Sequence, residues 1–433
     1  MPSTRKEFLK LALPNMLSNL TVPLAGLIDT ALLGHLTEVK YLAGVALGSI
    51  LFDFIYWLFG FFRMSTTGLT AQAVGAKHIK NISLIPLRGL IMAFVTGFII
   101  LILSSHIADA GFWILHGSDE VIEQGRLYFQ ARIWGAPAVL MNFVFIGWLL
   151  GKGLGKKVLI LSMIANGTNI ILDVLLIFKL GLGSQGAGLA TMISQYLMLI
   201  GALWFCLPTL VRSRHLINWS HILDKAELKN LIALNRDIFI RTLTLITSFS
   251  YFTNASSGMG VVILATNAIL LKILSIASYF IDGLAFAIES VAGRFKGAGN
   301  TKSMNEAIRL ALWSGLGTGF FFAALFNLFP NHLFLLLTNQ APVLEELQRY
   351  CLWLFPVMLL GSVAYIWDGV FLGLSEGKKL RNCMLISAAV AFFPLAVYAS
   401  HGGFVHLLWL SMTLFMGLRS LTLWWSYGRS VNA

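Results

Sequence analysis

Charged residues are scarce in this chain of 433 residues. They make up 12% of the sequence, against roughly 25% in soluble domains, while hydrophobic residues make up 57% and the mean hydropathy is +0.79. No polar stretch is long enough to form a second, soluble domain. The composition therefore excludes a soluble protein and indicates one embedded in a lipid bilayer.

Residues for metal binding and nucleophilic catalysis are also few. The three cysteines are odd in number, have no metal-ligand spacing and lie in or beside apolar segments, which excludes a disulfide framework and a zinc site. The nine histidines are scattered mostly in connectors, and no nucleophile triad is recognisable. We therefore expect no enzyme activity, no cofactor and no tightly bound metal.

Two features that could indicate nucleotide or nucleic-acid binding lack the necessary context. The run Gly151-Lys-Gly-Leu-Gly-Lys-Lys lies in a short connector and lacks the Ser or Thr that follows the lysine of a phosphate loop. The net charge of +12 comes from basic residues in short connectors between apolar segments. Membrane topology explains these residues better than nucleic-acid binding does.

Apolar stretches recur along the whole chain. A spanning helix needs about 20 apolar residues, and twelve such stretches alternate with short polar breaks. The first stretch is expected to remain in the protein, because Pro14, Pro23 and Asp29 lie in it and it exceeds a signal peptide in length. We predict an all-α polytopic membrane protein with spans at residues 8–33, 43–67, 87–109, 127–150, 158–180, 187–209, 231–256, 261–288, 308–329, 350–374, 382–400 and 403–426.

Basic residues concentrate in every second connector. By the positive-inside rule these connectors lie in the cytoplasm together with both termini, and the expected location is the cell (inner) membrane. The other connectors are poor in Lys and Arg and rich in acids. The basic set comprises Lys77, Lys80, Arg88, Lys152, Lys156, Lys157, Arg212, Arg214, Lys225, Lys229, Arg294, Lys296, Lys302, Arg309, Lys378, Lys379 and Arg381.

The sequence contains a weak internal repeat at an offset of 222 residues. Leu42 falls on Leu264, and Gly155-Lys-Lys falls on Gly377-Lys-Lys. Each repeat has six spans, an even number, so the two must be parallel repeats about an axis along the membrane normal. We predict an N-terminal lobe at 1–210, a cytoplasmic connector at 211–230 and a C-terminal lobe at 231–433.

Polar residues in the first half are expected at similar membrane depths. Insertion of an ionisable residue into the membrane costs roughly 2.5–3.5 kcal/mol on insertion scales, so the presence of Asp29 in a span calls for an explanation. Asn166, Asn169 and Asp173 lie on the fifth predicted helix, where Asp173 is about 22 Å along the axis and shares a face with Asn169. Thr191 lies about one turn into the sixth predicted helix, which enters from the opposite side.

These side chains are predicted to converge on one polar pocket. A network that only holds helices together is the alternative, as is usual for membrane Asn and Thr. Two carboxylates in contact would require that at least one binds a proton or a cation, which is what ion coupling needs. Protons and sodium would use the same residues, so transient sodium at Asp29, Asp173 and Asn169 stays open.

Two prolines and several charges complete the candidates. Pro14 and Pro23 each remove a backbone hydrogen bond from the first helix, which can bend there, although membrane helices also tolerate proline. In the second half, Asp237 and Arg241 are four residues apart and are expected to pair.

The repeat also relates charged positions of the two halves. Asp53 and Lys272 lie at nearly equivalent depths and could bridge the halves, although separate partners are an alternative. The offset places Tyr251 where the first half has Asp29. We therefore expect ion handling in the first half only, with the second half helping to shape the cavity.

Several short motifs occur in a specific order. They are Leu13-Pro14 and Gly26-Leu-Ile-Asp29-Thr, then Arg63-Met-Ser-Thr-Thr-Gly-Leu-Thr-Ala-Gln72, then the segment 166–173, and Asn235-Arg-Asp-Ile-Phe-Ile-Arg241. With them the whole chain resembles the multidrug and toxic compound extrusion (MATE) family, and most closely its DNA-damage-inducible protein F branch. The resemblance implies two six-helix lobes that form a V around a central cavity and alternate between inward and outward openings.

The resemblance also implies roles for individual residues. In relatives the acid of the first helix is the protonation or sodium site, which transfers to Asp29, assisted by Asn169, Asp173 and Thr191. Bending at the first-helix proline transfers to Pro14. The pair of Asp53 and Lys272 is not part of the family pattern.

We therefore expect a monomeric, cation-coupled antiporter that uses protons and exports amphipathic or cationic organic compounds. A flippase for lipids or lipid-linked precursors is the alternative of similar architecture, and its anionic headgroups would need several basic residues in the cavity. A membrane-embedded transferase is a third hypothesis. It would need clustered carboxylates or a partnered histidine near a membrane face.

Overall fold

The computed structural model describes residues 4–35, 38–213, 215 and 217–431, and these are helices joined by short turns, with no strand among them. Contacts group the chain into two units, which we treat separately. The N-terminal unit is Leu17–Leu231, and the C-terminal unit is Met1–Met16 with Ile232–Ala433. The predicted lobe boundaries follow the topology of the chain and stay a prediction.

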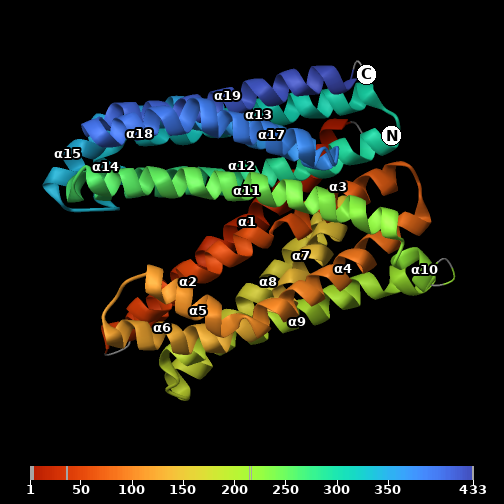
Figure 1. Cartoon of the computed structure of the whole chain (residues 1–433), viewed down its shortest axis with the longest axis horizontal. Coiled ribbons are helices and arrows are strands. Elements are labelled where there is room, and N and C mark those ends of the chain that lie inside the picture. The colour runs from red at the N-terminus through yellow and green to blue at the C-terminus, as the bar shows by residue number, and fades with distance from the viewer. Residues whose placement is uncertain (1–3, 36–37, 214, 216, 432–433) are drawn as a thin grey trace. The chain divides into compact units, whose positions relative to one another are not determined.

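The first helix, α1 (Thr4–Gly34), is continuous and contributes to both units. The N-terminal unit continues with the helices labelled in Figure 1. They are α2 (Val39–Phe59), α3 (Phe61–Gly75), α4 (Ile79–Ile102), α5 (Ser104–Ile114), α6 (Asp119–Arg132), the 3-10 turn η1 (Ile133–Gly135), α7 (Ala136–Gly151), α8 (Gly155–Asp173), the π-helical turn η2 (Val174–Lys179), α9 (Gly183–Arg212) and α10 (Trp219–Ile222).

The C-terminal unit begins within α11 (Lys225–Gly258). The breaks inside its longer spans are single turns of 3-10 or π helix. Its other elements are α12 (Val261–Gly297), α13 (Thr301–Leu328), α14 (Pro330–Leu335), α15 (Ala341–Tyr350), η4 (Cys351–Trp353), α16 (Leu354–Gly373), α17 (Gly377–Ser387), η5 (Ala388–Phe392), α18 (Phe393–Gly402) and α19 (Val405–Val431).

The all-α prediction is confirmed. Among the described residues, eleven helical segments are long and apolar enough to cross a membrane. Our seventh predicted span corresponds to α11, which has 34 residues but carries Arg236, Asp237 and Arg241 in its middle. These charges lower the hydropathy of α11, which is why composition alone does not mark it as a span.

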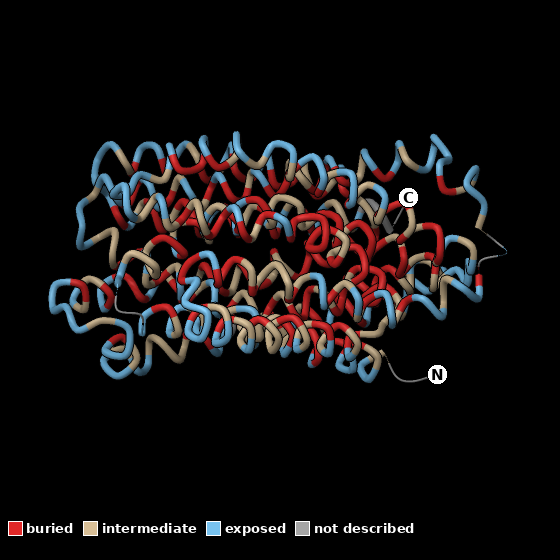
Figure 2. Tube along the Cα trace, turned by 90° about the horizontal axis from the view of Figure 1, so that it is seen from below, coloured by how far each residue is buried: buried red, intermediate tan, exposed pale blue. Residues whose placement is uncertain are grey.

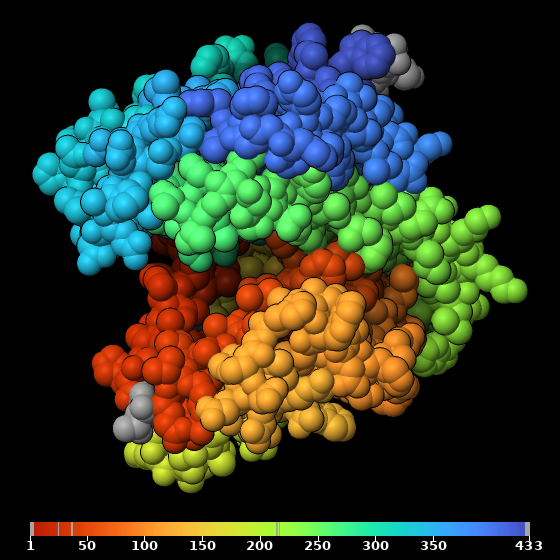
Figure 3. All heavy atoms as spheres, turned by 60° about the vertical axis from the view of Figure 1, so that its left-hand side comes forward, coloured from red at the N-terminus to blue at the C-terminus, as the bar shows by residue number. Residues whose placement is uncertain are grey.

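The outer faces of both units are apolar. Trp113, Trp204, Val261 and Leu336 are 78–85% exposed, and exposed residues recur along most helices (Figure 2). Helices α3, α7 and α16 are instead buried along most of their length. The orange side chains of α4 to α6 gather on one face of the N-terminal unit in Figure 3. Apolar surface of this extent is expected where lipid, not water, surrounds the helices.

The two units repeat the same helix packing. In the N-terminal unit α7 contacts α3 and α4, and in the C-terminal unit α16 contacts α12 and α13. A methyl group on Gly147 would lie less than 3.0 Å from the Arg63 carbonyl, and one on Gly369 would lie equally close to the Ala285 carbonyl. The offset of 222 residues relates Gly147 to Gly369 and Arg63 to Ala285. The repeat therefore extends to how closely these helix backbones approach each other.

The segment between α9 and α11 is attached to α4 through one buried arginine. Arg88 donates from Nε to the Ile222 carbonyl at 3.2 Å and from Nη2 to the His221 carbonyl at 2.7 Å. Its Nη1 forms a salt bridge with Glu227 at 3.1 Å. This part of the predicted connector is therefore docked onto the N-terminal unit.

Candidate functional site: a carboxylate pair and the pocket beside it

The carboxyl groups of Asp29 on α1 and Asp173 on α8 lie within hydrogen-bonding reach of each other. Asp173 is only 1% exposed, and Asp29 is half-buried. No donor among the described residues reaches either oxygen of Asp173 or the Oδ1 of Asp29. Two carboxylates cannot donate to each other, so a stable contact requires a shared proton or a bound cation.

The other predicted residues of this site lie on α8 and α9. Asn169, one turn before Asp173, donates from Nδ2 to the hydroxyl of Thr191 at 3.5 Å. Thr191 in turn donates to the Ala187 carbonyl at 3.0 Å. The structure thus brings the predicted Asn and Thr together and connects α8 with α9 one turn from the carboxylate pair.

The α-helical part of α8 ends at Asp173. The following six residues, Val174–Lys179, form the π-helical turn η2. Such turns are rare, occur frequently at functional sites and widen the helix by one residue. The run Val-Leu-Leu-Ile-Phe-Lys gives no sequence signal for this change, so sequence reasoning did not find it.

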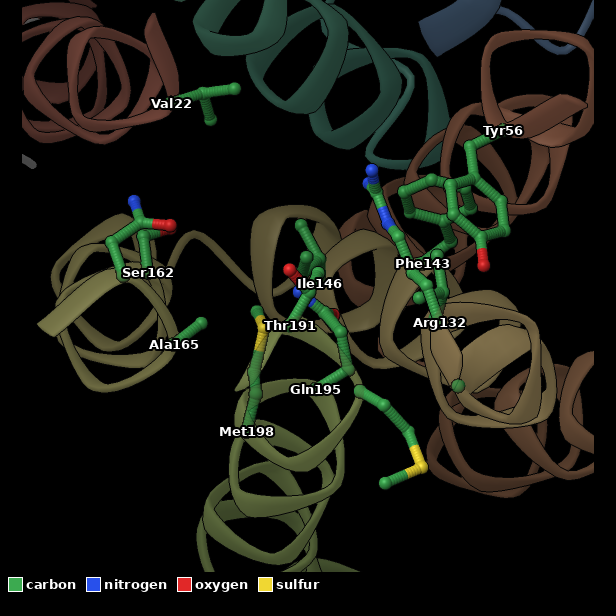
Figure 4. A pocket seen from close by; sticks show the side chains of 14 residues that line it. Val22, Tyr56, Arg132, Phe143, Ile146, Ser162, Ala165, Thr191, Gln195 and Met198 are labelled. Carbon is green, nitrogen blue, oxygen red and sulfur yellow. The ribbon is translucent and has the colours of Figure 1, made fainter. Parts of the chain in front are cut away.

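A pocket of about 280 Å³ lies next to the pair within the N-terminal unit. Figure 4 shows Arg132 and Tyr56 on one side, Ser162 and Ala165 on the opposite side, and Thr191 between them. Thr191 therefore belongs both to the pocket wall and to the hydrogen bond with Asn169. This shared residue provides a physical connection between the pocket and the α8 face that holds Asp173.

Arg132 is the charged residue of the pocket wall. Its Nη1 donates to the Tyr128 hydroxyl, and its guanidinium lies 4.5 Å from the centre of the Phe52 ring. It also acts electrostatically on Asp29 and Asp53. Sequence reasoning missed Arg132 although it lies inside the predicted span 127–150, where the rule applied to Asp29 would have found it.

Buried charges of the C-terminal unit are arranged differently. Asp368 on α16 accepts from the Nη2 atoms of both Arg241 on α11 and Arg419 on α19. The three side chains are 4%, 6% and 0% exposed, respectively. The negative charge of Asp368 is therefore compensated by fixed partners inside the protein.

Comparison with known proteins identifies the family. The MatE family model matches residues 14–175 and 238–398, which is more than half of the chain. The chain belongs to the MatE family.

Individual relatives agree with this assignment. The chain is 36% identical to the DNA damage-inducible protein F of Escherichia coli K12, over 98% of this chain and 92% of that protein. It is 27% identical to the probable multidrug resistance protein NorM of Thermotoga maritima, over 80% of this chain and 75% of that protein. An outward-facing multidrug resistance MATE family transporter superposes with a TM-score of 0.87 at 21% identity, covering 99% of this chain and 96% of that one.

A second MATE-like structure is similarly close. A MOP superfamily transporter from Pyrococcus furiosus, described as having a binding pocket of reverse polarity, gives a TM-score of 0.86 at 20% identity over 99% and 96% of the two chains. The predicted fold of twelve transmembrane helices in two repeats is thereby confirmed. The prediction that the protein is not an enzyme is confirmed as well, because MATE proteins are transporters.

The first helix of this MATE protein contains both predicted hinge residues. Pro14 and Pro23 lie inside α1, which is continuous from Thr4 to Gly34. Near them the hydroxyls of Ser18 on α1 and Ser162 on α8 hydrogen-bond at 2.6 Å. Bending at either proline stays a prediction.

We expected Asp237 to pair with Arg241, but the salt bridges in the structure join each of them to another residue. Asp237 pairs with Arg381 at 2.6 Å and with Arg236 at 3.2 Å, whereas Arg241 pairs with Asp368. The partners Arg381 and Asp368 come from helices far away in sequence. Spacing along one helix does not reveal them.

The remaining candidates of the MATE protein lie in different units. Asp53 and Lys272 are both exposed, on α2 and α12, and their pairing stays a prediction. Tyr251 contacts the Ser400 hydroxyl at 3.3 Å and packs edge-on against Phe393. The position corresponding to Asp29 is therefore occupied by an aromatic contact.

Proposed function

We propose that this MATE protein exports amphipathic or cationic organic compounds across the cell (inner) membrane in exchange for protons, as a monomer with both termini in the cytoplasm. The observation that supports proton coupling is the contact of Asp29 with Asp173. Neither oxygen of Asp173 has a donor among the residues that the structure describes. The alternate basic connectors support the orientation.

A proton shared by the two carboxyls supplies the missing donor and removes one negative charge. When the proton leaves, two charges face each other in surroundings of low dielectric, where repulsion is strong. Separation of α1 from α8 relieves this repulsion, so protonated and deprotonated forms favour different helix arrangements. A ligand shifts such an equilibrium only if its affinities for the two forms differ. The proton meets this condition, because it binds more tightly to the closed carboxylate pair than to the separated one.

The coupling step follows from this difference. A proton that reaches Asp29 from outside favours the closed carboxylate pair and changes the wall of the neighbouring pocket, to which α1 contributes Val22. Substrate is then released outward. Sodium would use the same oxygens together with Asn169, but a proton needs only the two carboxyls. The small volume of the pocket favours an organic molecule over a lipid-linked precursor.

The test is dye efflux from proteoliposomes. Purified protein is reconstituted with ethidium, a cationic fluorescent dye, and efflux is followed under an inward proton gradient, an inward sodium gradient, or neither. Wild type should respond to protons, and Asp29→Asn should not. Glu123→Gln, at an exposed position, serves as the matched control and should behave like wild type. Unchanged gradient-driven efflux in Asp29→Asn would disprove the role of Asp29, and a response to sodium alone would disprove proton coupling.

A further inference from the structure

The pocket of the N-terminal unit has an uneven polarity. Among its lining residues Arg132 is charged, and none is Asp or Glu. Its polar neighbours in the wall, such as Tyr56, Asn166 and Gln195, are neutral. The wall therefore has a formal charge of +1, which is opposite to what a purely cation-binding pocket would need.

The unpartnered polar atoms of these lining residues are donors. The Nε of Arg132, the Nδ2 of Asn166 and the hydroxyl of Tyr56 are buried, and none of them has a hydrogen-bond partner within the described ranges. Burial of a donor without an acceptor is unfavourable. A ligand that brings acceptor oxygens into the pocket would remove that cost, whereas an ammonium group would add further donors.

Arg132 is also held in position before any ligand arrives. The Tyr128 hydroxyl accepts from Nη1, and the Phe52 ring lies against the guanidinium. A guanidinium fixed in this way can bind carboxylate or sulfonate oxygens through charge-assisted hydrogen bonds. Asp29 and Asp53 act on the same guanidinium electrostatically, but neither belongs to the pocket wall.

The pocket also suits an apolar body. The pocket wall contains apolar residues, among them Val139, Met192 and Met198, and methionine adapts to ligands of different shape. The volume of about 280 Å³ is close to the lower end of small-molecule sites. One polar anchor beside an apolar wall describes a site for a small amphipathic molecule.

We propose that Arg132 determines the specificity of this pocket, and that the pocket binds amphipathic organic anions by their carboxylate or sulfonate end. This proposal rests on the proposed function for its relevance to export, and it narrows the amphipathic compounds that this pocket binds to those with an anionic end. Binding itself requires no gradient. It can therefore be tested separately from coupling.

The test compares two probes with the same apolar body. Binding of 2-naphthalenesulfonate and of 2-naphthylmethylammonium to the purified full-length protein in neutral detergent is measured by titration calorimetry. Wild type should prefer the sulfonate, and Arg132→Gln should weaken sulfonate binding about tenfold or more without weakening ammonium binding. Arg132→Lys should retain part of the affinity, because it keeps the charge but not the planar fork.

Two further variants keep the result decisive. Arg126→Gln removes an exposed arginine from the same helix, where it pairs with Asp109, and should bind both probes like wild type. Tyr56→Phe removes only one donor and should weaken sulfonate binding a few-fold, which decides the matter if Arg132→Gln does not fold. Equal wild-type affinity for the two probes, or full sulfonate affinity in folded Arg132→Gln, would overturn the proposal. Loss of proton-driven efflux with intact sulfonate selectivity would instead count against the proposed function alone.

Discussion

Asp173 and Asp368 are both almost fully buried carboxylates, one in each unit, and their surroundings are opposite. Asp173 faces a second carboxyl and is reached by no donor in the described part of the chain, whereas Asp368 accepts from two arginines. Compensation by fixed partners makes a buried charge structural, while a buried charge without fixed partners needs a mobile one. Two units with repeated packing thus differ in how a buried carboxylate is compensated.

The two repeats share their backbone packing and differ in their polar side chains. Gly147 lies close to the Arg63 carbonyl of α3, and Gly369 lies equally close to the Ala285 carbonyl of α12. The polar side chains differ, since Asp29 corresponds to Tyr251. Backbone packing constrains glycine at these contacts, but it does not constrain which charges line the interior.

Removal of the charge at Asp173 should have the largest effect, and it should affect transport. In Asp173→Asn the pair can no longer exchange a proton, so proton-driven efflux from proteoliposomes should fall to the level of protein-free liposomes. Thermal unfolding in detergent should be unchanged or shifted upward, because a buried carboxylate without a donor disappears. A large loss of thermal stability would break the comparison with Asp368.

Removal of the charge at Asp368 should instead lower the stability of the folded protein. Asp368→Asn leaves two buried guanidiniums without their carboxylate, a type of change that costs about 3–5 kcal/mol. The measurement is the midpoint of denaturant unfolding in detergent. If the variant is as stable as wild type but fails to transport, the two units have been assigned the wrong roles.

Equal substitutions at the repeated glycines should have equal effects. Gly147→Ala and Gly369→Ala each introduce a methyl group against a carbonyl oxygen, and overpacking of this kind costs about 1–3 kcal/mol. Gly317→Ala, where nothing lies within 4 Å of the added carbon, is the control and should be neutral or slightly stabilising. Clearly unequal costs at the two repeated positions would show that their backbone environments are not equivalent.

The smallest effect is expected at a connector position where the units differ. Lys152 lies between α7 and α8, and the offset of 222 residues places Leu374 at its counterpart. Burial lowers the pKa of Lys152 below its usual 10.5, although a hydrogen bond to Thr209 at 3.0 Å holds the ammonium. The folded form therefore binds protons less readily than the unfolded one at this site.

Stability should consequently rise slightly as the pH increases from the lowered pKa of Lys152 toward 10.5, the value it has when unfolded. Lys152→Leu should abolish this rise, which can be followed by unfolding midpoints over the alkaline range. Lys156→Leu, at an exposed position in the first turn of α8, is the comparison variant. An identical alkaline profile in Lys152→Leu and wild type would contradict the assignment.

The twelve spans and the similar depths of Asp29 and Asp173 follow from the sequence because both depend on position along a helix. Hydropathy locates each span, and a rise of about 1.5 Å per residue gives the depth of Asp29 and Asp173. Rotation of one helix against another is not encoded in this way. The partners of Arg241 and Asp237 were therefore missed, since Asp368 and Arg381 lie more than a hundred residues away.

Other features were missed for different reasons. Arg132 has a sequence signal, because it is a basic residue within a predicted span. The rule used for Asp29 was not extended to it. Arg419 has the same signal, but its role depends on Asp368 and Arg241, which only the packing of α11, α16 and α19 brings together. The π-helical turn after Asp173 arises in an apolar run that is compatible with an ordinary α-helix.

The docking of the inter-unit segment by Arg88 has a consequence for how the chain is assembled. Residues 4–16 belong to the unit formed mainly by the second half of the sequence, and residues up to 231 belong to the unit formed by the first half. Each half of the chain thus contributes a short segment, here called an arm, to the unit that the other half mainly forms. A chain cut between α9 and α10 would give two fragments with exchanged arms, so co-expressed halves are expected to find each other and restore one protein.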